Sequence, residues 1–214
     1  MGSGILETTE NVGTEHVAVA NRAYISFEEY LAQSSDTRIC EWVDGEIITM
    51  AGASFEHQNL DRFLLTIINL YVESKDLGIV ISSPFAMKLE SQRRGREPDI
   101  LFVGKERQHL FKKTYLDGAA DLAIEIISPE SVGRDRGEKF VEYEAAGIRE
   151  YWLIDPERRQ VEFYRLNADG FYGLAPTPEG VFQSEVLPEF FLRVAWLWQE
   201  PLPTIAALKE LKLL

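Results

Sequence analysis

The 214 residues suit one domain with a sizeable core, and their 45% hydrophobic and 27% charged residues are ordinary for a globular protein. The 22 basic and 35 acidic residues give a net charge of −13, which argues against broad, nonspecific binding of nucleic acid by a basic face. The longest strongly apolar stretch, 64–72, is too short to span a bilayer, and the single cysteine, Cys40, excludes an internal disulfide and favours a reducing compartment, the cytoplasm.

The N-terminal part of the chain predicts a leader, a short helix and a hairpin. Residues 1–20 show no hydrophobic periodicity, so we expect a flexible leader before a single domain at 21–214. Start signals predict a short helix at 26–33. Apolar and β-branched residues on both sides of Asp44-Gly45 predict a hairpin at 38–50, because this dipeptide favours a two-residue turn.

The middle of the chain changes from helical to strand periodicity. Apolar residues at i, i+3 and i+4 spacing over 60–71 predict a long helix that ends before Gly78. Alternating apolar and polar residues over 85–89 predict a half-buried strand. The polar, basic segment 91–96 is expected to be a loop, and the apolar run 100–103 is expected to be the next strand.

The last part of the chain alternates strands with helices. We expect a strand at 122–127, a helix at 134–146, a strand at 151–154, a hairpin at 161–171 and a short helix from Thr204. Elements in this order predict an α/β fold with a mixed sheet and helices on its faces.

Glu125 lies inside the apolar run 122–127, which should form a largely buried strand. A buried carboxylate needs a partner or a proton, so a metal-binding or catalytic role is favoured here. Two other interpretations stay open: a glutamate that faces solvent on an edge strand, or one that pairs with a buried arginine.

Asp99 follows Pro98 at the start of another predicted strand. Alone, the dipeptide Pro-Asp is common in turns. Adjacent short strands, however, can bring the carboxylates of Asp99 and Glu125 to one point, where their repulsion requires a cation. Oxygen ligands of this kind select Mg²⁺ or Mn²⁺.

Lys139 lies on the helix that follows the Glu125 strand. The chain rises about 10 Å beyond Glu125 and then returns along a helix at about 1.5 Å per residue, which brings Lys139 back to the level of Glu125. A cation there can orient an attacking water and offset charge on a phosphate. The alternative is a solvated helical lysine.

These residues carry a family resemblance that runs from about Ser26 to Trp198. The segment 97–99 followed by 123–129 resembles the PD-(D/E)XK nuclease superfamily. The segments 134–139 and 150–156, together with the hairpin residues 41–46, are similar to the Uma-type restriction-endonuclease-like family.

The resemblance implies a restriction-endonuclease-like fold with a mixed central sheet, flanking helices and added β-hairpins. It implies Mg²⁺-dependent (or Mn²⁺-dependent) hydrolysis of a phosphodiester in nucleic acid, with DNA the expected substrate. Asp99 and Glu125 would bind the metal, and Glu41 would complete its shell. The superfamily pattern would place a lysine at Ile127, so the resemblance implies that the catalytic lysine has moved to Lys139.

Two further features are candidates for the same site. His57 opens the long helix and is a possible accessory residue; the alternative is a cap or surface histidine. The arginines Arg93, Arg94 and Arg96 precede Asp99 and could contact nucleic-acid phosphates; the alternative is a solvated loop.

Two rival functions remain open at this point. The first is a non-catalytic interaction module that keeps the nuclease fold, which the net charge and the displaced lysine favour. The second is a metal-independent protein-binding domain whose aromatic tail, Phe190 to Trp198, joins two subunits. If exposed, these aromatics would support a homodimer, although core packing explains them equally well.

Overall fold

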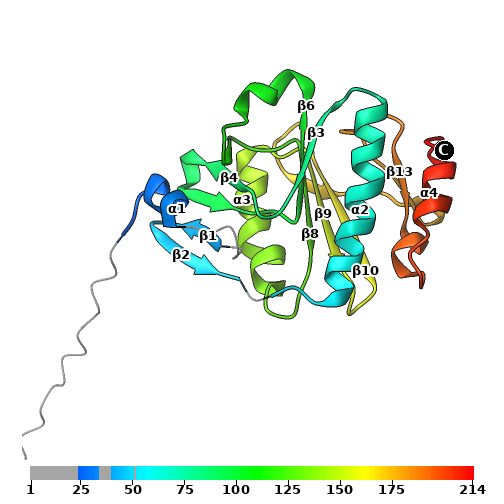
Figure 1. Cartoon of the computed structure of the whole chain (residues 1–214), viewed down its shortest axis with the longest axis horizontal. Helices are drawn as coiled ribbons and strands as arrows, with labels where there is room; N and C mark the ends of the chain where they lie inside the picture. The colour runs from blue at the N-terminus through cyan, green and yellow to red at the C-terminus, as the bar shows by residue number, and fades with distance from the viewer. Residues whose placement is uncertain (1–23, 34–39, 51) are drawn as a thin grey trace, which may run out of the picture.

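A six-stranded sheet lies at the centre of the described fold, and helices cover both of its faces (Figure 1). This computed structural model describes residues 24–33, 40–50 and 52–214, so the expected leader at 1–20 lies outside the described residues. The strands have the order β11-β10-β9-β8-β6-β3, in which β8 pairs with β9 in parallel and the other neighbours pair antiparallel. The predicted mixed α/β architecture is confirmed. The bounds are β3 (Gly78–Ser82), β6 (Ile100–Gly104), β8 (Leu122–Ile126), β9 (Glu150–Asp155), β10 (Gln160–Leu166) and β11 (Tyr172–Leu174).

Helix α2 (Phe55–Ser74) packs on one face of this sheet and α3 (Lys139–Ala146) on the other. Side chains alternate along β8, so Ile124 and Ile126 enter the core beneath α2. Burial of each such side chain contributes about 1.5–3 kcal/mol. Glu125 lies between them and therefore points to the α3 face, where the Tyr143 hydroxyl donates a hydrogen bond to it at 2.9 Å.

A second sheet lies on the α3 side, with the strand order β2-β1-β5-β4-β7. The predicted hairpin forms its edge, and its turn residues Asp44 and Gly45 both have positive φ, 50° and 90°. Helix α1 (Phe27–Gln33) packs on this sheet through Phe27 and Tyr30. The strand bounds are β1 (Cys40–Val43), β2 (Glu46–Thr49), β4 (Ala86–Leu89), β5 (Arg94–Arg96) and β7 (Tyr115–Asp117).

The segment 91–96, expected to be a basic loop, is different in the structure, and that prediction was wrong. Residues Glu90–Gln92 form a short 3-10 turn, η1, and Arg94–Arg96 form β5, which pairs with both β1 and β4. Gly95 allows this packing, because a Cβ at this position would lie 2.6 Å from the Phe27 ring. The strand carries Arg96 into the interior, where its side chain is fully buried.

The predicted helix at 134–146 consists of two parts. Arg134–Glu138 form a π-helical turn, η3, and α3 continues from Lys139 to Gly147, whose φ of 78° closes the helix as expected. Such wide turns are frequent at functional sites because they change which side chains point to one side of the helix.

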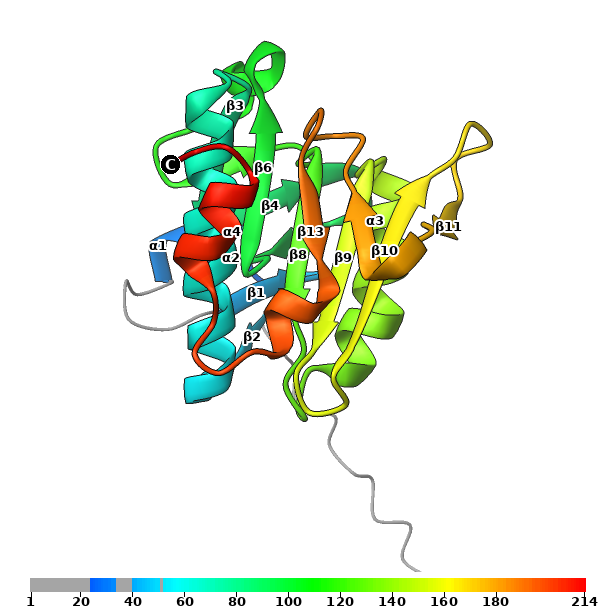
Figure 2. The ribbon, with the colours of Figure 1, turned by 90° about the vertical axis from the view of Figure 1, so that its right-hand side faces the viewer.

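The C-terminal segment covers the outer side of α2. Figures 1 and 2 show α4 (Thr204–Glu210) beside α2, with the strand β13 (Phe191–Arg193) next to it. Strand β12 (Val181–Gln183) pairs with β13. Phe190 and Trp196 are buried in the core, so the core-packing alternative holds for them and they give the homodimer no support. The remaining short turns are η2 (Lys105–Leu110), η4 (Pro178–Gly180) and η5 (Val194–Trp198). Among the described residues, no helix has the length and apolarity needed to cross a membrane.

Candidate active site

A pocket of about 70 Å³ opens where the start of β6, the middle of β8, the N-terminal end of α2 and the η3 turn meet. This volume holds a small cluster of water molecules or a hydrated ion. Acidic side chains are the largest group in its lining, which consists of Glu41, Met50, Gly52, Ala53, His57, Glu97, Asp99, Glu125, Ile126, Ser128, Glu130, Ser131, Arg134, Asp135 and Lys139.

Asp99 and Glu125 reach this pocket from neighbouring strands. Ile100 pairs with Ile124 in the antiparallel register of β6 and β8, so Asp99, which immediately precedes β6, lies opposite Glu125. The Oδ2 atom of Asp99 accepts the Ile126 N–H at 2.7 Å. Among the described residues, every hydrogen bond to the two carboxylates goes to Oδ2 of Asp99 or Oε1 of Glu125. The other oxygen of each carboxylate has no hydrogen-bond partner in the described part of the chain, which leaves it available to a further ligand.

Lys139 lies in the centre of a group of carboxylates. Its Nζ is 2.9 Å from Glu125 Oε1, 3.1 Å from Glu41 Oε1 and 3.2 Å from Asp135 Oδ1, and the residue is 5% exposed. Burial lowers the pKa of Lys139, but the three carboxylates outweigh burial and hold this pKa well above its usual range. Burial also raises the pKa of Glu125 well above its usual range, and Lys139 opposes that shift. The ammonium therefore stays charged in this pocket.

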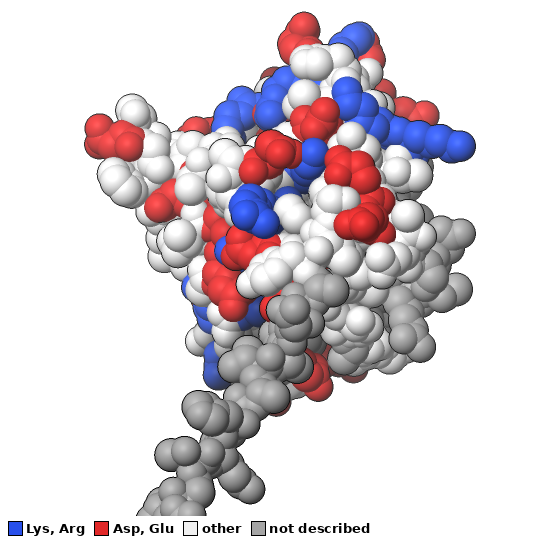
Figure 3. Space-filling model, turned by 90° about the vertical axis from the view of Figure 1, so that its left-hand side faces the viewer, with Lys and Arg blue, Asp and Glu red and all other residues white. Residues whose placement is uncertain are grey.

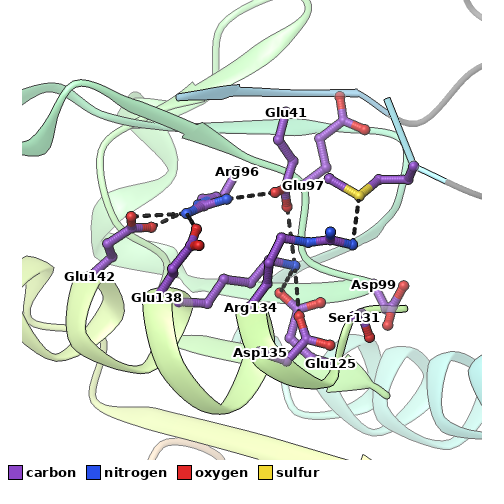
Figure 4. A network of polar contacts seen from close by, with 12 residues as sticks. Glu41, Arg96, Glu97, Asp99, Glu125, Ser131, Arg134, Asp135, Glu138 and Glu142 are labelled. Carbon is purple, nitrogen blue, oxygen red and sulfur yellow. Dashed lines mark hydrogen bonds and ion pairs between the residues drawn. The ribbon is translucent and has the colours of Figure 1, made fainter. Parts of the chain in front are cut away.

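Arg96 is the second buried cation beside the site (Figure 4). Its Nη1 donates to Glu41 Oε2 at 2.7 Å, its Nε donates to Glu142 Oε2 at 2.7 Å, and its Nη2 contacts Glu138 at 3.1 Å. The proposed phosphate contact of Arg96 is therefore contradicted, because this fully buried guanidinium is bound by carboxylates.

The other two arginines of the predicted loop lie away from the pocket lining. Arg94 pairs with Asp44 and Glu142 at 2.7 and 2.6 Å, while Arg93 is exposed. Glu41 does line the pocket, but Lys139 and Arg96 hold its two oxygens. Desolvation opposes ionisation of Glu41, yet these two cations lower its pKa overall. Glu41 therefore acts as a counter-ion to Lys139 and Arg96 in this structure, and its expected role as a metal ligand stays a prediction.

His57 lies beside Asp99, on the first turns of α2. Ser54 caps this helix by accepting the His57 N–H, and the His57 ring places Nε2 3.2 Å from Asp99 Oδ2. Burial lowers the pKa of His57, but the hydrogen bond and charge of Asp99 outweigh burial and raise it. With the Ile126 N–H, this contact holds Oδ2 and so orients the whole Asp99 carboxylate.

The pocket fits a divalent ion through oxygen ligands. No group of three or more histidine, cysteine or acidic side chains within the described ranges is already arranged around one point as metal ligands. Asp99 and Glu125 nevertheless each offer a carboxylate oxygen without a hydrogen bond from the described residues. One or two carboxylates completed by water and substrate oxygens are the usual protein site for Mg²⁺.

Several residues of the site were not singled out from the sequence. Asp135 contacts Lys139, and Tyr143 contacts Glu125. The i, i+4 spacing of Asp135 and Lys139 was a signal in the sequence for the contact between these two residues. Glu97 accepts the Tyr30 hydroxyl at 2.9 Å, and burial raises its pKa to about 7. Arg134 lines the pocket from the π-helical turn.

Comparison with known proteins identifies the family and the fold of this chain. The sequence pattern of the family Uma2, described as "Putative restriction endonuclease", matches residues 27–195. Two uncharacterized proteins of Synechocystis sp. are similar to this chain. The protein sll1609 is 28% identical over 155 residues, which cover 72% of this chain and 87% of that protein. The protein slr1290 is 27% identical over 148 residues, which cover 68% of this chain and 76% of that protein. A crystal structure of a "putative nuclease belonging to DUF820" from Anabaena variabilis superposes with a TM-score of 0.67 at 20% identity, over 81% of this chain and 97% of that one. At this identity the superposition shows the shared fold, which is the restriction-endonuclease-like fold expected from the sequence.

Proposed function

Because the chain belongs to the Uma2 family, we propose that it is a Mg²⁺-dependent nuclease that hydrolyses phosphodiester bonds in DNA. The observation that carries the proposal is the pocket shared by Asp99 and Glu125, with the Lys139 ammonium 2.9 Å from Glu125. Two acidic residues on adjacent strands and one nearby lysine are the groups that metal-assisted hydrolysis of a phosphodiester requires.

Each residue of the pocket has a distinct task in this proposal. Asp99 and Glu125 would hold the ion, which when bound supplies Lewis acidity and lowers the pKa of a bound water. His57 and the Ile126 N–H keep Asp99 oriented. Lys139, held at the pocket by its three carboxylates, would orient the attacking water and offset charge that develops on the phosphate.

The surface charge indicates that substrate is bound locally. Figure 3 shows one face of the molecule, on which red acidic and blue basic side chains are interspersed; among its coloured residues there is no broad basic area. With a net charge of −13, long-range attraction of a polyanion is weak. Affinity for nucleic acid would then depend on the metal ion and on a few cations inside the pocket.

A non-catalytic module that keeps the fold is the second candidate. The engagement of Lys139 by three carboxylates favours it, because an ammonium held this way is less available to a substrate. Under this alternative the protein would bind metal and nucleic acid without turnover.

A cleavage assay separates the two candidates. We would incubate the parent with supercoiled plasmid, linear duplex, single-stranded DNA and RNA, each with Mg²⁺, Mn²⁺ or EDTA. We expect cleavage of DNA that EDTA abolishes and that falls at least about a hundredfold in Asp99→Asn and Glu125→Gln. The exposed residues Asp169 and Glu157 provide the matched controls Asp169→Asn and Glu157→Gln, which should cut at the parent's rate. Metal binding by the parent without cleavage of any substrate would refute the nuclease in favour of the module.

A further inference from the structure

Arg134 is the pocket-lining cation that has no carboxylate partner among the described residues. Its Nη2 donates to the Met50 sulfur at 3.2 Å. Its Nε is buried and makes no hydrogen bond to any residue that the structure describes. A thioether is a weak acceptor, so this contact leaves most of the hydrogen-bonding capacity of the guanidinium unused.

The other cations of this region differ in that respect. Lys139 contacts three carboxylates, and Arg96 contacts three as well. Glu130 also lines the pocket, yet it makes no ion pair with Arg134 in the described part of the chain. A partly buried guanidinium without a counter-charge is costly, because the protein replaces neither its hydration nor its hydrogen bonds. Such a group indicates that an anion from outside the described chain completes the pocket.

The position of Arg134 suits a phosphate at the proposed centre. The π-helical turn η3 carries Arg134 and Asp135, and Lys139 follows one residue beyond it. Figure 4 shows the Arg134 side chain extending over Asp135 and Glu125 toward the side of the pocket where Asp99 lies. The guanidinium therefore shares one small pocket with the two carboxylates assigned to the metal.

We propose that Arg134 binds the substrate phosphate, with the Nε–H and a free Nη N–H donating to two of its non-bridging oxygens. The planar fork of an arginine matches a phosphate in this way, whereas a lysine acts as a point charge. The inference rests on the proposed function, since it assigns the substrate anion of the same pocket. It also moves the phosphate contact from Arg93, Arg94 and Arg96, where the sequence placed it, to Arg134.

Binding of an oligonucleotide tests this contact without requiring turnover. We would measure the anisotropy of a fluorescein-labelled single-stranded 12-mer with Ca²⁺ in place of Mg²⁺, at several salt concentrations, for the parent, Arg134→Gln and Arg134→Lys. Arg62 is exposed and outside the pocket lining, so Arg62→Gln is the control for the loss of one positive charge. Melting temperatures show whether each variant is folded, and Arg134→Lys remains informative if Arg134→Gln is not.

We expect Arg134→Gln to weaken binding by on the order of tenfold or more, and Arg134→Lys to retain part of the affinity. Loss of one phosphate contact should also reduce the slope of log K against log [salt] by about 0.7–0.9, a change that a purely structural role would not produce. Arg62→Gln should leave both quantities near those of the parent.

The outcomes separate this inference from the nuclease proposal. An Arg134→Gln variant with the parent's affinity and salt slope would overturn the phosphate contact, even if the parent cuts DNA. Binding that depends on Arg134 in a protein that cuts nothing would support the contact and refute the nuclease. A parent that binds no oligonucleotide would overturn the inference.

Discussion

Replacement of Lys139 by methionine should destabilise the metal-free protein. Methionine keeps the unbranched apolar stem and removes the charge, so the change isolates the ammonium from the packing of the side chain. The residue is 5% exposed, and its Nζ lies between 2.9 and 3.2 Å from Glu125, Glu41 and Asp135. Removing the cation leaves these buried carboxylates without most of their compensating charge.

The expected loss is about 3–5 kcal/mol, the range for removing one member of a buried ion pair. For a chain of this size, that corresponds to a decrease in melting temperature of about 6–20 °C. Because the pKa of Glu125 is already raised by burial, protonation of this carboxyl can relieve part of the repulsion. The difference between the variant and the parent should therefore be smaller at about pH 5 than at about pH 8.

Thermal unfolding followed by circular dichroism, with and without Mn²⁺, measures these effects. A divalent ion can replace the missing positive charge, so Mn²⁺ should raise the melting temperature of Lys139→Met more than that of the parent. Lys75→Met is the control, since Lys75 forms an exposed pair with Glu189 that contributes about 0–1 kcal/mol. Equal stability of Lys139→Met and the parent without metal would refute the assigned ion-pair role. Equal shifts by Mn²⁺ would show that lysine and metal do not compensate the same carboxylates.

Three further predictions address catalysis, pH and the buried arginine. Lys139→Met should bind Mn²⁺ more tightly than the parent, as its larger melting-temperature shift requires. When saturated with the ion, it should still cut DNA on the order of a hundredfold more slowly in single-turnover assays, and an unchanged rate would remove Lys139 from the mechanism. Burial and Asp99 raise the pKa of Asp61 from 3.8 to about 6, so the folded state holds this proton more tightly and loses stability as the pH rises through that interval. Asp61→Asn should therefore stabilise the metal-free protein by up to about 3 kcal/mol at about pH 8 and by little at about pH 4. Urea unfolding measures this gain in stability, and an equal gain at the two pH values would contradict the raised pKa of Asp61. Urea unfolding should show that Arg96→Met lowers the free energy of unfolding by about 3–5 kcal/mol, whereas the exposed control Arg93→Met changes it by less than about 0.5 kcal/mol. An equally small effect of both substitutions would show that Arg96 is not a buried counter-ion.

The elements with strong local patterns could be predicted from the sequence. The i, i+3, i+4 spacing predicted α2, and the Asp44-Gly45 turn predicted the first hairpin. The buried carboxylate of Glu125 could also be anticipated, because the apolar residues on either side of it leave no solvent-facing strand surface.

The interior position of Arg96 could not be predicted in the same way. Arginine is normally solvated, and the two carboxylates that bind Arg96 most closely come from Glu41 and Glu142, 55 and 46 residues away in the chain. Local sequence around Gly95 therefore indicated a loop, whereas long-range ion pairs and the contact with Phe27 make it a strand.

The tail aromatics illustrate a related limit of the sequence. Their apolar character predicted that they would be buried against something, but it did not distinguish another subunit from the core. Phe190 and Trp196 pack in the core that α2 and the central sheet share, because the C-terminal segment folds back onto these elements. The π-helical form of the η3 turn likewise carries no local sequence signal that we could identify.

The metal site is the central claim, and an anomalous-difference map from a crystal soaked with Mn²⁺ tests it most directly. We predict one strong peak in the pocket, within about 2.3 Å of one oxygen each of Asp99 and Glu125, that is lost in crystals of Asp99→Asn. A well-diffracting crystal without a peak at these two carboxylates, or with Mn²⁺ bound elsewhere while DNA is still cut, would contradict the account.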